Sequence, residues 1–244
     1  MTAFHIDIHS HLLPCIDDGA QTLDDAIELA RYAVAHGITH SVITPHIHPG
    51  RYDNDKDTIK AAFDQLQYEI NKQNIALKIA YAAEVRISVE MMELIKQNKI
   101  PFLGQLQNKN ILLLEFPHSH ILPGSEKLIT WLTNRNIKPI IVHPERNKEL
   151  QADFSKITPF LKAGSLLQVT AGSLIGKFGP KSQDIARILI ENNWAHFVAT
   201  DAHNLQHRPP DLNEVNQYLQ HTIGKTQTRK LLFDNPWSIV NNKF

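Results

Sequence analysis

The chain has 244 residues, enough for one large α/β barrel or two smaller domains. Its 25 Lys and Arg residues balance 25 Asp and Glu residues, so the net charge gives no reason to expect nucleic acid or an anionic membrane as a partner. Cys15 is alone and excludes an internal disulfide, and the chain has neither a signal-peptide pattern at its start nor a long apolar run, so we expect a cytoplasmic protein without membrane insertion.

Short apolar runs alternate with amphipathic stretches, which is typical of repeated βα units and a largely parallel sheet. A helix is bounded clearly where Thr22 or Asp24 caps its start and Gly37 ends it. In chain order the pattern predicts strand 5–8, helix 23–35, strand 40–43, helix 55–72, strand 77–83, helix 88–97, strand 111–116, helix 125–134, strand 139–142, helix 155–162, strand 166–169, helix 181–191, strand 197–200 and one or two helices after residue 211.

Seven strands with helices between them favour an α/β fold in which the sheet closes on itself. We found no linker, low-complexity segment or internal repeat that would divide the chain. The sequence therefore predicts a single domain over residues 1–244, a distorted (β/α)7 TIM-like barrel, with an open doubly wound sheet as the alternative.

Histidines and carboxylates follow these predicted strands, and barrel active sites are built at the carboxyl ends of strands. The sixth strand ends only in Thr170. The other six run into metal-competent side chains, which are Asp7, His9 and His11, then His46, Glu84, Glu115, His143 with Glu145, and Asp201 with His203. Such a pattern rarely arises by chance, and it predicts a site for several metal ions.

His9 and His11 are two residues apart on an extended segment, so both imidazoles point to the same face and can reach one ion. Glu115 directly follows an apolar strand, where a buried carboxylate needs a cation. For Glu115 and Glu84 the alternative is an ion pair, with a neighbouring helix or, for Glu84, with Arg86. Mixed nitrogen and oxygen ligands without cysteine suit Mn²⁺, Fe²⁺, Zn²⁺, Co²⁺ or Mg²⁺.

Two arginines are candidates for binding an oxyanion beside these ions. Arg146 follows His143 by three residues in a predicted loop, and its planar guanidinium matches a phosphate group. Its alternative role is an ion pair with Glu145 or Glu149. Arg208, just beyond His203, is a weaker candidate for the same task. Together these residues indicate a metal-dependent hydrolase of a small anionic group.

The assembled motifs resemble the polymerase and histidinol phosphatase (PHP) superfamily, and within it the bacterial manganese-dependent protein-tyrosine phosphatases of capsule and exopolysaccharide loci. The resemblance covers nearly the whole chain. Its carriers are DIHSHLLPCIDDG at 7–19, TPH at 44–46, AAEVR at 82–86, LLEFP at 113–117, HPERN at 143–147 and TDAHN at 200–204.

The resemblance implies a PHP-type barrel with three divalent ions, Mn²⁺ above the other candidates. It also adds Asp18, which strand position alone would assign to a helix cap. The ligand sets it implies are His9, His11, Glu84 and Asp201 for the first ion, Glu84, Glu115 and His143 for the second, and Asp18, His46 and His203 for the third.

The implied activity is hydrolysis of protein phosphotyrosine by a metal-activated hydroxide, with Arg146 and Arg208 binding the phosphate. The implied partner is the phosphorylated C-terminal tail of a bacterial tyrosine autokinase, and the chain is compatible with an oligomer. The alternatives are a PHP phosphoesterase for a small metabolite such as histidinol phosphate, and a non-catalytic metal-binding regulator.

Overall fold

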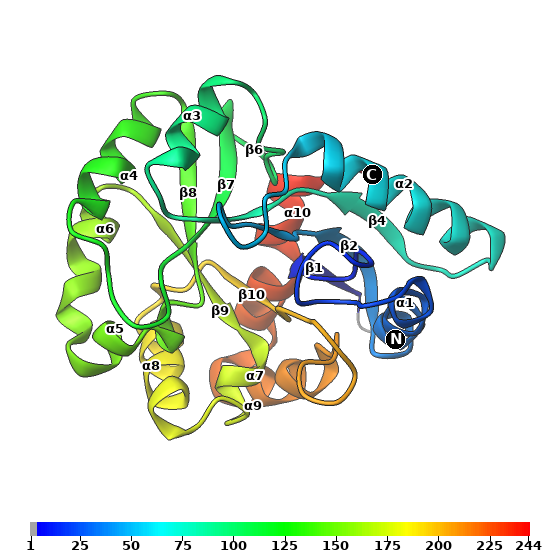
Figure 1. Cartoon of the computed structure of the whole chain (residues 1–244). Coiled ribbons are helices and arrows are strands. Elements are labelled where there is room, and N and C mark those ends of the chain that lie inside the picture. Colours follow the sequence, from blue (N-terminus) through cyan, green and yellow to red (C-terminus); the bar gives the residue numbers. More distant parts are fainter. Residues whose placement is uncertain (1–3) are drawn as a thin grey trace.

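Parallel strands form the centre of the molecule and helices surround them in the computed structural model, which describes residues 4–244 (Figure 1). The strands are β1 (His5–Ser10), β2 (Ile38–Ile43), β3 (His46–Ile47), β4 (Lys78–Tyr81), β5 (Glu84–Arg86), β6 (Gly104–Leu106), β7 (Lys109–Glu115), β8 (Ile137–Val142), β9 (Leu166–Thr170) and β10 (Phe197–Ala199).

The helices connect these strands and lie mostly on the outside of the barrel (Figure 1). Within residues 4–244, no helix has both the length and the apolar character needed to cross a membrane. The helices are α1 (Leu23–Ala35), α2 (Lys56–Lys72), α3 (Glu90–Lys96), α4 (Ser125–Thr133), η1 (Pro144–Arg146), α5 (Lys148–Ala152), η2 (Phe154–Ile157), α6 (Thr158–Lys162), α7 (Ala171–Leu174), α8 (Pro180–Glu191), α9 (Asn213–Arg229), η3 (Lys230–Asp234) and α10 (Asn235–Val240).

The last strand of the barrel lies beside the first. One sheet has the strand order β1-β2-β4, and the other has the order β10-β9-β8-β7-β5-β3. The two sheets are connected where β5 follows β4 along the chain. The Asp201 amide donates to the His9 carbonyl at 2.9 Å, and a parallel bridge joins Ser10 to Ala202, which places the end of β10 beside β1. Seven parallel strand positions therefore close into the distorted (β/α)7 barrel predicted from the sequence, rather than an open sheet.

The predicted elements occur where expected, with differences at their ends and breaks. Thr22 is the N-cap of α1 and forms a capping box with Asp25, and Asp55 caps α2 in the same way with Thr58. The predicted strand 77–83 is broken into β4 and β5. The predicted helix 155–162 is divided between η2 and α6.

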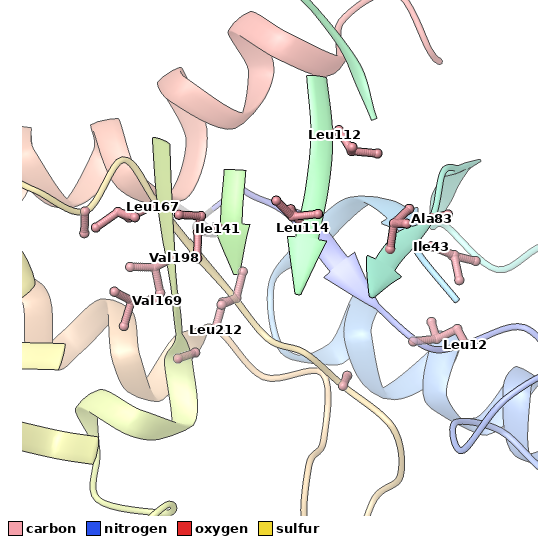
Figure 2. Close-up of a cluster of buried hydrophobic side chains, with 14 of the residues drawn as sticks. Leu12, Ile43, Ala83, Leu112, Leu114, Ile141, Leu167, Val169, Val198 and Leu212 are labelled. Carbon is pink, nitrogen blue, oxygen red and sulfur yellow. The ribbon is translucent and has the colours of Figure 1, made fainter. Parts of the chain in front are cut away.

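Alternate residues of the strands pack in two apolar layers. Ile111 and Leu113 of β7 belong to an inner layer that includes Ile239 of α10, whereas Leu112 and Leu114 face the surrounding helices. Figure 2 shows part of the outer layer, with side chains from β7, β8, β9 and β10. The inner layer leaves the carboxyl ends of the strands to polar side chains.

Candidate metal centre

Four predicted ligands converge at the carboxyl ends of the strands. The Nε2 atoms of His9 and His11 are 3.3 Å apart, so the two imidazoles point the same way, as their spacing predicts. Glu84 Oε2 lies 3.3 Å from each of these nitrogens. Asp201 Oδ1 lies 3.4 Å from each of them. All four residues are buried, and three separate strand ends bring them together.

Asp18, His46 and His203 form a neighbouring group. Asp18 Oδ1 lies 3.3 Å from His46 Nε2 and 3.4 Å from His203 Nε2. The ring of His203 stacks on that of His11 with 3.9 Å between centroids, so this group adjoins the first. The Asp18 side chain is 39% exposed, which opens this side of the cluster to solvent.

Glu115 and His143 lie on another side of Glu84. His143 Nε2 is 2.8 Å from Glu84 Oε1, and Glu115 Oε2 is 3.8 Å from His46 Nδ1. Arg86 Nη2 contacts Glu115 Oε2 at 2.9 Å. Glu115 thus has the ion pair considered as an alternative, but its arginine comes from β5 and not from a helix. Within residues 4–244, Arg86 makes no ion pair with Glu84.

The nitrogen and oxygen atoms of this cluster are better placed to coordinate divalent ions than to form hydrogen bonds with one another. His46 Nδ1 and Glu84 Oε2 are 2.9 Å apart, yet neither has a hydrogen-bond partner within the described chain. Buried polar atoms without partners are costly. The 3.3–3.4 Å spacing around His9 and His11 matches the edge of a tetrahedron whose metal–ligand bonds are about 2.1 Å long. The residues present therefore fit ions with nitrogen and oxygen ligands.

Three sets of ligand atoms lie within 4.8 Å of one another. They differ in three respects from the partition that the resemblance implies: His11 joins the Asp18 group, His143 joins His9, Glu84 and Asp201, and His46 takes the place of His143 beside Glu84 and Glu115. The nine predicted ligands are all included. The sets are His11 with Asp18, His46 and His203; His9 with Glu84, His143 and Asp201; and His46 with Glu84 and Glu115.

Two of these residues have a backbone that non-glycine residues seldom adopt. His143 follows β8 with φ of 34°, and Asp201 follows β10 with φ of 52°. Left-handed backbone costs roughly 1–2 kcal/mol for an L-residue, and such strain concentrates at functional sites. At both strand ends the turn directs the side chain into the cluster.

Charge pairing keeps the central carboxylates ionised. Burial acts to raise the pKa of Asp201, but Arg146 and His203 lower it well below its usual range. Burial likewise opposes ionisation of Glu84, and the neighbouring His9 and His46 lower its pKa. Two buried negative charges in contact with imidazoles favour binding of cations.

Two supporting residues were missed by the sequence analysis. Asp17 Oδ2 lies 2.7 Å from His11 Nδ1, and Gln168 Oε1 lies 2.8 Å from His9 Nδ1. Each contact orients an imidazole whose Nε2 faces the cluster. Asp17 could have been found from its place in the Asp-Asp-Gly motif. Gln168 had no such signal, because it lies inside β9, the strand for which only the terminal Thr170 was noted.

Arg146 and Arg208 both reach the cluster. Arg146 is in contact with Asp201 Oδ2, and Arg208 Nη1 lies 3.4 Å from the same oxygen. The Arg146 guanidinium also stacks on the ring of Phe178, 4.4 Å from its centroid. The ion pair considered with Glu145 is absent within residues 4–244, where Glu145 accepts hydrogen bonds from β9 and α7 instead.

A cleft of about 220 Å³ opens over these groups. Its lining combines carboxylates and imidazoles with arginine and aromatic side chains. The lining residues are Asp18, His46, Arg51, Glu84, Arg86, Glu115, Phe116, His118, Val142, His143, Pro144, Arg146, Asn147, Phe178, Asp201 and Arg208. This arrangement can hold cations and, above them, an anionic group attached to an aromatic ring.

Comparisons with known proteins agree with this chemistry. Residues 5–241 match the family described as capsular polysaccharide synthesis, CpsB/CapC. The tyrosine-protein phosphatase YwqE of Bacillus subtilis is 36% identical over 98% of this chain and 92% of its own length. The putative tyrosine-protein phosphatase CapC of Staphylococcus aureus is 34% identical over 86% of this chain and 81% of its own.

Solved structures place the fold beside the same proteins. A crystal structure from work on YwqE of Bacillus subtilis and CpsB of Streptococcus pneumoniae, described as unique metal-dependent tyrosine phosphatases, superposes with a TM-score of 0.88 at 34% identity. It covers 98% of this chain and 95% of that one. An organophosphorus hydrolase mutant from Deinococcus radiodurans has a TM-score of 0.58 at 13% identity over 96% and 91% of the two chains, which shows a shared fold alone.

Proposed function

The chain belongs to the capsular polysaccharide synthesis family CpsB/CapC, and from this membership we propose that it is a metal-dependent protein-tyrosine phosphatase. One observation carries the proposal: a cluster of imidazoles and carboxylates shares one cleft with the Arg146 guanidinium and the Phe178 ring. A phosphate ester of an aromatic alcohol presents both an anion and a ring to such a cleft.

We propose three divalent ions, with Mn²⁺ as the resident metal. Ions held by the nine ligands would supply Lewis acidity and lower the pKa of water at the site. Glu84 is placed to serve two ions, because its Oε2 faces His9 and His11 while its Oε1 contacts His143. Asp17 and Gln168 hold the imidazoles in the orientation that ligation needs.

The chain's own cations would bind the phosphate. Arg146 is held from two sides, by Asp201 and by Phe178, so its guanidinium is fixed before substrate arrives. Fixed donors stabilise developing charge without reorganisation. Arg208 adds a second guanidinium on the Asp18 side. A phenolate leaving group, whose pKa is near 10, needs less protonation than an alkoxide.

For the physiological substrate we propose the phosphorylated C-terminal tail of a bacterial tyrosine autokinase, met in the cytoplasm. The support is the match of this chain to the capsule-synthesis family CpsB/CapC, together with its similarity to proteins named as tyrosine phosphatases. Dephosphorylation of a tail peptide, compared with the same peptide carrying phosphoserine, tests this choice.

The deciding experiment strips the protein with chelator, restores one metal at a time and measures phosphate release. We expect phosphotyrosine peptide to be hydrolysed only after metal is restored, with Mn²⁺ most effective and about three ions per chain by mass spectrometry. A higher kcat/KM for histidinol phosphate than for phosphotyrosine peptide would favour a small-molecule phosphoesterase. No hydrolysis with any metal would favour a non-catalytic regulator.

The arginines provide a second test. Arg146→Ala should lower kcat/KM by about 100- to 1000-fold, the usual cost of removing one fixed oxyanion donor. Arg146→Lys should recover little of it, since a lysine lacks the planar fork. Arg208→Ala should have a smaller effect, and Arg187→Ala on α8, which pairs only with Glu191 within the described chain, is the control. Full activity in Arg146→Ala would contradict the phosphate role.

A further inference from the structure

A groove leads away from the cleft to an apolar pocket between α3 and α4, and we propose that it binds the substrate polypeptide beside the phosphotyrosine. The pocket would take one apolar side chain of that polypeptide. The proposal rests on the proposed function and specifies the substrate class: a phosphotyrosine peptide with an apolar residue up to about three positions away and acidic character between the two.

The groove is continuous with the cleft. Its middle section, which we call the corridor, shares Arg51, Arg86 and His118 with the cleft. At its other end the corridor shares Ile87 and Ser88 with the apolar pocket. A chain leaving the cleft on this side would therefore pass over the corridor and meet the pocket at Ile87 and Ser88.

The pocket is suited to an aliphatic or aromatic side chain. It has a volume of about 350 Å³ and lies between Met92 of α3 and Leu128 and Trp131 of α4. Val89 also lines the pocket and is 80% exposed, so its side chain adds to the apolar surface that a ligand could cover. Burial of an apolar substrate residue here would remove both surfaces from water.

The charge of the groove favours a polypeptide with carboxylates. Arg51 of the corridor and Lys127 of the pocket supply the positive charge of the groove. Arg86 also lines the corridor but pairs with Glu115, and burial lowers the pKa of His48 and of His118 there. Within residues 4–244, neither section is lined by an acidic side chain, and Arg51 makes no ion pair there. This cationic path complements an acidic segment, whereas a second copy of this electrically balanced chain would have no such general match.

The length of the groove fixes the spacing. Arg86 lines the cleft and Val89 lines the pocket, and because they are three positions apart in the chain, their Cα atoms lie at most about 10 Å apart. An extended peptide advances about 3.3 Å per residue. The apolar side chain should therefore lie up to about three residues from the phosphotyrosine.

The experiment moves a single leucine through positions within five residues on either side of phosphotyrosine in a Gly-Ser-Glu peptide. We expect kcat/KM to rise about tenfold in a narrow window up to about three residues away, on one side only. A flat profile would overturn the proposal. Because p-nitrophenyl phosphate is too small to reach the groove, its hydrolysis by the wild-type protein reports on the proposed function alone.

Met92→Glu tests the pocket with the same substrates. It should lower kcat/KM for the leucine peptide, relative to that for p-nitrophenyl phosphate, by about tenfold, mainly through KM. Ile188→Glu makes the same kind of change at a 39% exposed site on α8 and should leave the ratio unchanged. An unchanged ratio in Met92→Glu would overturn the proposal and mean that the pocket has no occupant. A change in oligomeric state without a change in the ratio would also overturn it and would indicate that a second copy of this chain covers the pocket.

Discussion

Asp17 supports two groups of the cluster with one carboxylate. Its Oδ2 contacts His11 Nδ1 at 2.7 Å and accepts a hydrogen bond from the His46 amide at 3.0 Å. Its Oδ1 accepts from the Gly19 amide at 2.9 Å. His11 fixes Asp17 in turn, because burial acts to raise the pKa of this carboxyl and the charge of His11 lowers it below its usual value.

Asp17→Asn should therefore weaken metal binding without unfolding the protein. The amide keeps a similar shape but loses the charge that orients the His11 imidazole, and loss of such a partner typically costs 10- to 100-fold in metal affinity, so we expect about that range. Calorimetric titration of the chelator-treated protein with Mn²⁺ measures it. Asp53→Asn, in a surface loop, is the matched control. Equal affinities for Asp17→Asn and wild type would show that the contact is incidental.

His5 makes the stability of the fold depend on pH. Burial lowers its pKa from 6.5 to about 4, although Asp211 acts in the opposite direction. The folded protein thus stays neutral at His5 while the unfolded chain takes up a proton at about pH 6.5. Because the unfolded state binds more protons in this window, stability falls as the pH drops from about 6.5 toward 4, by about 1.4 kcal/mol per pH unit from this residue.

His5→Leu should remove this part of the slope. Urea unfolding of the wild type and the variant at pH 7 and pH 5 measures it, and the difference between the two proteins should change by about 2 kcal/mol. His221→Leu, on the exposed face of α9, is the control. A difference that does not vary with pH would mean that His5 titrates alike in both states.

At the scale of elements, the loop after β1 is pressed closely against the strand end. Cys15 and Ala20 are joined by a backbone hydrogen bond of 2.9 Å, and the Ala20 amide donates to the His11 carbonyl at 3.1 Å. A Cβ atom on Gly19 would lie 2.0 Å from that same carbonyl oxygen. Only glycine allows the loop to bring Asp17 and Asp18 up to the histidines.

Gly19→Ala should displace this loop. We expect a loss of about 2–3 kcal/mol in stability from overpacking, together with weaker metal binding. Gly164→Ala is the control, because its φ is +89° but nothing lies within 4 Å of its added methyl group. That control should cost about 1 kcal/mol and leave metal affinity intact. Urea unfolding and metal titration distinguish the two variants, and equal behaviour would contradict the close approach.

The sequence predicted the elements that a periodic pattern encodes. Seven strands were visible because each is a short apolar run, and the polar site was visible because six of them run into His, Asp or Glu. The break between β4 and β5 was not visible, because Ala82 and Ala83 continue the apolar run. Gln168 was missed for a related reason: which face of β9 it occupies depends on the barrel closing, and a single strand does not encode that.

The site depends on contacts between distant parts of the chain. The resemblance supplied Asp18, which lies in a loop and has no strand-end signal. The sequence offered Arg86 as an alternative partner for Glu84, because residues two apart share a side of a strand. Arg86 instead pairs with Glu115, its neighbour in the register between β5 and β7.

At the scale of the whole molecule, the candidate ligands come from both sheets of the barrel, so ions held there would link the beginning of the chain to its last strand. Chelator should therefore lower the melting temperature, since ligands that bind only the folded state stabilise it by mass action. One ion at a hundred times its Kd adds about 2.7 kcal/mol, or about 5–10 °C for a chain of this size. Calorimetry with Mn²⁺ and with EDTA measures the difference in melting temperature. Asp18→Ala should reduce this difference by about the contribution of one ion. Identical melting temperatures in Mn²⁺ and EDTA would contradict a metal centre that joins the two sheets.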